Sequence, residues 1–126
     1  MDEFAFYKAV QAIHRFCSVE LSAFYLDILK DRMYCSHPTD PARLAARRVM
    51  SETVSALDRL MAPFIPFTAE EVWTHMPASL KGGLPSVHLA DWPSDAGADA
   101  DPQTVRRWDL FMSLRDAVLK GIEMAR

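Results

Sequence analysis

The sequence predicts an all-α protein, a helical bundle of about four to five helices with one long loop that contains a short strand-like run. Three observations support this fold class. Apolar residues recur every three or four positions over most of the chain, which is the spacing of amphipathic helices. Proline-containing breaks at 37–41 and 63–66 separate these stretches. With 126 residues, 50% of them apolar, the chain has the size of one domain and can build a core.

Each helix follows from this periodicity together with start and stop signals. The expected helices cover 3–17, 19–35, 41–64, a short stretch after residue 68, and 102–125. Asp40 is a suitable N-cap, and Pro41 fits the first position of the helix that follows it. Thr68 and Glu71 have the spacing of a capping box, which predicts the start of the short helix. Residues 77–101 are rich in Pro, Gly, Ser and Asp and form the predicted loop, with SVHLADW as its strand-like run.

Composition and charge exclude several classes of protein. The chain has no run of about 18 apolar residues that could span a membrane, and MDEFAFYKAV lacks the pattern of a secretory signal. Cys17 and Cys35 lack a metal-binding spacing and fit reduced core thiols of a cytoplasmic protein. The net charge of −3 argues against a general nucleic-acid coat. Residues 49–100 are the most acidic part, so we expect any polyanion-binding surface on the two ends of the chain and the acidic segment facing away from it.

The chain contains no constellation of residues typical of an enzyme. HExxH, paired-cysteine and G-x-S-x-G patterns are all absent. Glu71 and His75 lie four apart and could share a metal, but a solvated helix end is the simpler interpretation. The turn at residues 81–83 could touch a phosphate, yet no phosphate-binding loop surrounds it. We therefore predict no catalytic and no metal-binding residue in this chain.

The stretch FCSVELSAFYLDILKDRMY mixes charged and apolar residues. On a helix that advances about 100° per residue, Glu20, Asp27 and Asp31 fall within about 40° of one another. A proton-transfer or cation site is one interpretation of these acids, and a solvated charged face is the preferred one. Arg32 lies near the middle of the opposite, apolar arc. This position favours a buried ion pair over a role at the surface.

Basic residues near one end of the predicted bundle are the remaining candidates for function. If the helix over 19–35 packs antiparallel to the next helix through the 36–40 link, the end of one lies beside the start of the other. The residues gathered there would be Lys30, Arg32, Tyr34, Arg43 and Arg47, with Arg15 and Arg48 as further candidates. Such a cluster could bind phosphates while an aromatic ring stacks on an unpaired base. Ordinary surface charge is the alternative interpretation.

Four segments in order give the chain a family resemblance. FCSVELSAFYLDILKDRMY is followed by a break, then by LDRLMAPFIPFTAEEVW, SVHLADWP and LRDAVLK. This pattern resembles the anticodon-binding domain of isoleucyl-tRNA synthetases over nearly the whole chain. The MAPFIPFTAEEVW segment is similar in the valyl, leucyl and methionyl relatives, whereas ELSAFYLDILKDRMY and SVHLADWP look specifically isoleucyl.

The resemblance implies a fragment of a larger enzyme that ligates isoleucine to its tRNA using ATP. Signatures of the HIGH and KMSKS kind are absent, so this chain alone is expected to be inactive and to hold no cofactor. ATP, and the zinc that some members bind in a tail, would belong to the parent enzyme. The implied partners are the isoleucine tRNA, contacted through the basic residues named above, and the other synthetase domains, in a cytoplasmic and monomeric protein without membrane contact.

Two alternatives to this interpretation remain open. The chain could be a structural helical bundle that docks another domain or subunit through Trp73, Trp108 and the first helix. It could also be the equivalent domain of a valyl-tRNA synthetase.

Overall fold

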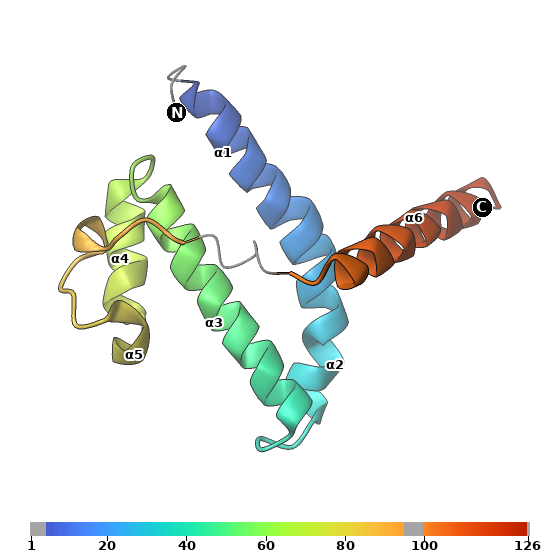
Figure 1. The fold of residues 1–126 in the computed structure, drawn as a ribbon, viewed down its shortest axis with the longest axis horizontal. Helices are drawn as coiled ribbons and strands as arrows, with labels where there is room; N and C mark the ends of the chain where they lie inside the picture. The colour runs from blue at the N-terminus through green and yellow to red at the C-terminus, as the bar shows by residue number, and fades with distance from the viewer. Residues whose placement is uncertain (1–4, 95–99, 126) are drawn as a thin grey trace. The chain divides into compact units, whose positions relative to one another are not determined.

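The structure, a computed structural model, describes residues 5–94 and 100–125. All regular elements in these residues are helical, and none is a strand, as the all-α prediction requires. The elements are α1 (Phe6–Arg15), the π-helical segment η1 (Phe16–Leu26), α2 (Asp27–Cys35), α3 (Pro41–Met61), α4 (Pro66–His75), the short α5 (Ala78–Lys81), the 3₁₀ turn η2 (Val87–Leu89) and α6 (Pro102–Met124) (Figure 1). The chain forms two compact units, Met1–Pro93 and Ser94–Arg126, which we describe separately.

One continuous helical rod runs from α1 through η1 to α2. The predicted boundary between helices near residue 18 is therefore wrong, because no glycine or proline interrupts residues 5–37. In η1 the backbone bonds to the fifth residue back, so side chains five apart lie above one another. This register places Arg15 Nε 3.7 Å from Glu20 Oε1. Glu20 is half-buried while Asp27 and Asp31 are exposed, so the three acids do not form the single face that regular helical geometry suggested.

α3 and α4 begin with proline at the first helical turn. α3 starts at Pro41 as predicted, but α4 starts at Pro66, and the capping box at Thr68 is wrong. Proline at the first position has no N–H to satisfy, so Pro66 can open the helix without a side-chain cap. α2 and α3 are antiparallel neighbours (Figure 1). Phe6 of α1 meets Phe64, beyond the end of α3, edge to face with ring centroids 6.3 Å apart.

The strand-like run SVHLADW is wrongly predicted. Val87–Leu89 form a 3₁₀ turn, and Ser86 Oγ accepts a hydrogen bond from the His88 N–H at 3.2 Å. The alternation of apolar and polar residues in this run fits a single turn that buries Val87, leaves Ser86 half-buried and exposes His88 and Leu89. Part of the predicted 77–101 loop, residues 95–99, lies outside the described residues.

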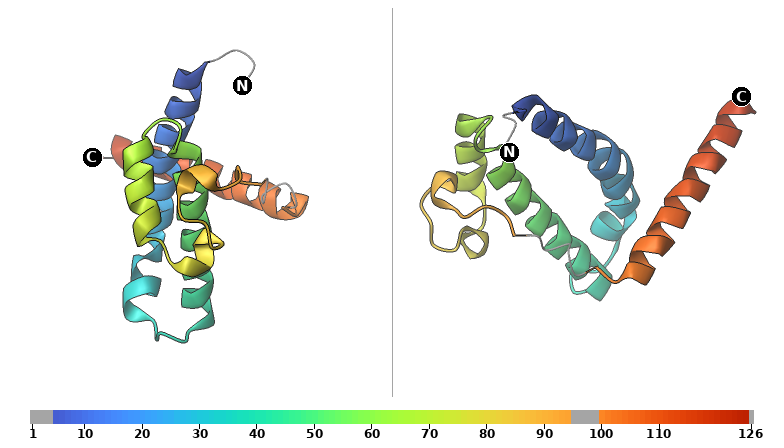
Figure 2. Two further views of the ribbon diagram at one scale, coloured as in Figure 1. Left: turned by 90° about the vertical axis from the view of Figure 1, so that its left-hand side faces the viewer. Right: turned by 45° about the horizontal axis from the view of Figure 1, so that its top comes forward.

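The core of the first unit is small and lies where α3, α4 and the segment after α5 meet. Figure 2 shows α4 alongside α3 from two directions. The buried members are Ala62, Ala69, Trp73, Met76 and Val87, with Leu80, Leu84 and Ala90 packed against them. Trp73 is only 2% exposed. The prediction that Trp73 supplies an exposed docking surface is therefore wrong, because the segment after α5 folds over the indole.

α6 forms the second unit, and its start is well capped. Asp101 accepts hydrogen bonds from the N–H groups of Gln103 and Thr104 at 3.2 and 3.1 Å. The bond from Gln103 is the main reason that the pKa of Asp101 lies below its usual range. The apolar side chains of α6, including Trp108, stay largely exposed. None of the helices in residues 5–94 and 100–125 is long and apolar enough to cross a membrane.

Candidate nucleic-acid interface

The link between α2 and α3 is held by local hydrogen bonds. Asp40 Oδ1 accepts from the N–H groups of Ala42 and Arg43 at 2.8 and 3.0 Å, which caps α3. Arg43 Nη1 donates to the Ser36 carbonyl oxygen at 2.7 Å, at the end of α2. These contacts bring the last turn of α2 and the first turn of α3 together at one end of the first unit, as the antiparallel prediction requires.

Three of the predicted site residues have exposed side chains at this end. Arg32 and Arg47 are exposed, and no described residue forms a hydrogen bond or ion pair with either guanidinium. Tyr34 is 84% exposed. The expected burial of Arg32 is wrong, because α2 buries only a narrow stripe against α3. Leu29 is buried, whereas its neighbour Ile28 is 53% exposed. We call Arg32, Tyr34 and Arg47 the hairpin-end set.

The other predicted contacts already have partners within the protein. Lys30 Nζ lies 2.6 Å from Asp27 Oδ1, and this hydrogen bond raises the pKa of Lys30 and lowers that of Asp27. Arg48 Nε donates to Glu52 Oε1 at 2.8 Å, the solvent-face pair expected from their spacing. Arg15 pairs with Glu20, as described above, and Arg43 holds the link. These four cations are therefore less available to a ligand than the hairpin-end set.

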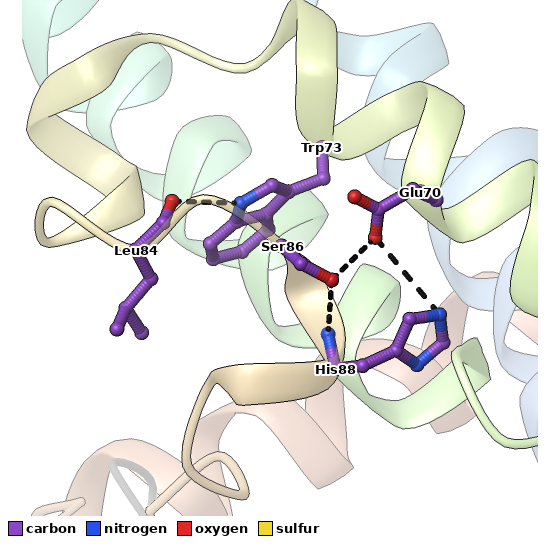
Figure 3. A network of polar contacts seen from close by, with 5 residues as sticks. All are labelled: Glu70, Trp73, Leu84, Ser86 and His88. Carbon is purple, nitrogen blue, oxygen red and sulfur yellow. Dashed lines mark hydrogen bonds and ion pairs between the residues drawn. The ribbon is translucent and has the colours of Figure 1, made fainter.

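A second polar cluster fastens the segment after α5 to α4 (Figure 3). Trp73 Nε1 donates to the Leu84 carbonyl oxygen at 3.2 Å, and Ser86 Oγ donates to Glu70 Oε2 at 2.7 Å. His88 Nε2 lies 3.9 Å from the same carboxylate oxygen. Sequence reasoning missed this cluster, because its members are up to 18 positions apart and no spacing rule links them. The only hint of this cluster in the sequence was the placement of Glu70 and Trp73 three residues apart in the predicted short helix.

Comparison with known proteins identifies the family. Residues 1–126 match the anticodon-binding domain of tRNA ligase. The chain belongs to this family. It is 43% identical to the isoleucine–tRNA ligase of Geobacillus thermodenitrificans, 42% identical to that of Geobacillus kaustophilus and 38% identical to that of Kosmotoga olearia, each over 125 residues. These alignments cover 99% of this chain but only 13%, 13% and 14% of the relatives.

The other binding candidates from the sequence concern metal ions, phosphate and the two cysteines. The described residues contain no group of three His, Cys, Asp or Glu side chains that could hold a metal ion. The turn at Lys81, Gly82 and Gly83 ends α5, with both glycines at positive φ, and Lys81 Nζ donates to the Thr74 carbonyl oxygen at 2.8 Å. This geometry is that of a helix stop. Cys35 is exposed, so its prediction as a core thiol is wrong, and Cys17 is half-buried.

Asp58 of α3 is the most unusual acid in the domain. It is 5% exposed, and its Oδ2 is buried without a hydrogen bond from any described residue. Burial raises the pKa of Asp58, the negative charge of Glu70 raises it further, and His88 opposes the shift. The acid therefore favours its neutral form more than an exposed aspartate does.

This shift predicts a pH dependence of stability. Because the folded protein holds the Asp58 proton more tightly than the unfolded chain, the stability from this group is full below the ordinary value of 3.8 and is lost as pH rises through the folded pKa. We expect Asp58→Asn to remove this loss, so that the variant gains stability over the wild type as pH rises from 3 to 7. Urea unfolding at several pH values measures the difference. A constant difference across this range would contradict the prediction.

Proposed function

We propose that this chain is the anticodon-binding domain of an isoleucine–tRNA ligase and that its hairpin-end set contacts the anticodon stem and loop. The observation that carries the proposal is the exposure of Arg32, Tyr34 and Arg47, without internal partners for the two guanidinium groups, where α2 meets α3. Arginine suits phosphate because its planar donors are rigid and always charged. An exposed tyrosine can stack on an unpaired base, which is how proteins commonly read single-stranded RNA loops.

The charge distribution supports RNA binding at the hairpin end. Asp58, Glu70, Glu71 and Asp91 lie on the second half of α3, on α4 and on the segment that follows. α3 has 21 residues, so its two ends are separated by roughly 30 Å, well over the screening length of about 8 Å at physiological salt. The hairpin end also carries acids, but Asp27 is paired with Lys30 and Asp40 caps α3. Phosphates bound at the hairpin end are screened from the acids at the far end of α3.

The wider activity belongs to the longer protein that we propose. It would activate isoleucine with ATP and transfer it to its tRNA, as a monomer in the cytoplasm, with this domain in contact with other synthetase domains. The relatives compared above are all named isoleucine–tRNA ligases, which favours isoleucine over valine as the substrate. No residue of this chain is assigned to ATP or to the zinc that some members of this enzyme family bind.

A salt titration tests the proposal. The chain should bind a labelled anticodon stem-loop of the isoleucine tRNA at low salt, and log K should fall linearly with log salt concentration. A slope of about −0.7 to −0.9 per phosphate contact is expected, so two to three contacts give a slope near −2. Fluorescence anisotropy measures the affinity. Binding no tighter than that of an unrelated acidic protein of the same size would refute the proposal.

A further inference from the structure

A groove between α3 and α4 has an apolar floor and no cover from the described part of the first unit. It consists of two adjoining hollows of about 180 and 440 Å³, which share Val54, Thr68 and Val72. Val54 and Val72 remain 44% and 37% exposed. Protein interiors are close-packed, and a hollow several times the roughly 30 Å³ share of one water molecule is ordinarily filled by side chains. The groove therefore has the size and lining of a packing surface.

Asp58 gives this groove a preference for a positively charged group. It lines the smaller hollow beside Leu57 and Met61, and its Oδ2 is buried without a hydrogen bond from any described residue. A buried charge is costly unless it is paired or bound to a metal. The charged groups that face it are Glu70 from α4, which carries the same sign, and His88 from η2. Neither neighbour hydrogen-bonds to it, so the compensating group has to come from elsewhere.

We propose that this groove is the docking site for an arginine or lysine side chain, carried on an apolar segment of the protein outside residues 1–126, with its cation against Asp58. Charge complementarity supports this occupant, since the described residues that line the two hollows include the acids Asp58 and Glu71, the histidine His75 and no lysine or arginine. The length of the relatives supports its source, because the chain spans 13% of the isoleucine–tRNA ligases that it matches. The inference rests on the proposed function only in placing this domain within such a longer protein.

The substitution Asp58→Asn tests the docking site because its effect should change sign with context. In the chain of residues 1–126 the variant removes an uncompensated buried charge, so its melting temperature should rise by a few degrees. In the full-length protein the variant removes one partner of an ion pair, so the transition of this domain should fall by a few degrees. Scanning calorimetry of both proteins measures the two shifts at pH 7.

Asp31→Asn is the matched control, because Asp31 is an exposed aspartate on α2 and the same atoms change. It should shift neither melting temperature. Stabilisation by Asp58→Asn in both contexts would show that no cation meets Asp58 and would overturn the proposal. Destabilisation in both would show that Asp58 is paired within residues 1–126 and would overturn it equally.

Hydrogen exchange provides a second readout that does not depend on a resolved melting transition. Backbone amides in 53–62 and 66–76 should exchange several-fold more slowly in the full-length protein than in the 126-residue chain, and Asp58→Asn should remove part of that protection. Equal exchange in the two proteins would contradict docking at this groove. The RNA titration reports on the opposite end of α3. A negative result there would refute RNA binding at the hairpin end and would leave docking at this groove to be judged by its own tests.

Discussion

Replacing Trp73 by alanine is expected to lower the free energy of unfolding by about 3–5 kcal/mol, the usual cost of truncating a large buried aromatic side chain. The indole is 2% exposed and is the largest fully buried side chain of the first unit. It also donates the hydrogen bond to the Leu84 carbonyl oxygen, which the alanine would leave unpaired. Domains of this kind are stable by only about 5–15 kcal/mol, so the variant should be near the limit of folding.

Urea denaturation followed by far-ultraviolet circular dichroism measures this loss. Trp92→Ala is the matched control, because the Trp92 side chain is 52% exposed and its truncation should cost much less. Trp73→Phe separates packing from hydrogen bonding. It retains most of the apolar volume but removes the donor to Leu84, so its cost should be about 1–3 kcal/mol. Equal costs for Trp73→Ala and Trp92→Ala would contradict the core described here.

Reversing the charge of both arginines of the hairpin-end set is expected to cause a large loss of RNA affinity. Arg32→Glu combined with Arg47→Glu should weaken binding of the isoleucine anticodon stem-loop on the order of a hundredfold at low salt, taking about 1.4 kcal/mol for each lost phosphate contact. The magnitude of the log–log salt slope should fall by about 1.4–1.8, because each lost contact removes about 0.7–0.9. Neither arginine has a partner among the described residues, so the fold should be unaffected. Anisotropy titration measures the affinity, and circular dichroism checks the fold.

The control has to match the change in net charge. Arg106→Glu with Arg107→Glu changes the charge by the same amount on exposed positions of α6, outside the hairpin-end set. This control should change affinity by only a few-fold. Arg43 is a poor choice for such a test, because its guanidinium holds the Ser36 carbonyl oxygen and its reversal would disturb the link itself. Equal losses in the two double variants would mean that RNA binding follows net charge alone.

Local signals predicted the helices well wherever the cause of the structure is local. The start of α3 followed from Asp40 and Pro41, and the same caps are present in the structure. The break expected near residue 18 was wrong, because residues 5–37 contain no glycine or proline that would stop a helix. The strand expected in SVHLADW was wrong for a different reason. Glu70 of α4 holds Ser86 at the start of this run, and Trp73 of α4 holds Leu84 just before it; both are distant from the run in sequence.

The candidate site was predictable as a position and not in its details. The antiparallel arrangement of α2 and α3 gathers the basic residues from helix order and a short link. Which of them are available depends on partners that periodicity cannot show, such as the Ser36 carbonyl oxygen for Arg43. Arg32 was expected to be buried because the prediction assumed neighbours on a broad face of its helix. The structure gives α2 one packed helix, so the side chain stays in solvent.

Photo-crosslinking tests most directly whether the hairpin end contacts the anticodon loop. A stem-loop that carries 4-thiouridine in its anticodon loop is bound to the wild-type chain at low salt, irradiated and digested with trypsin, and the adducts are located by mass spectrometry. We predict that the main adduct lies on peptide 33–43, which contains Tyr34 and the α2–α3 link. Adducts chiefly on peptide 60–81, which contains the acidic α4, or adducts no more frequent than with an unrelated hairpin RNA, would contradict the account.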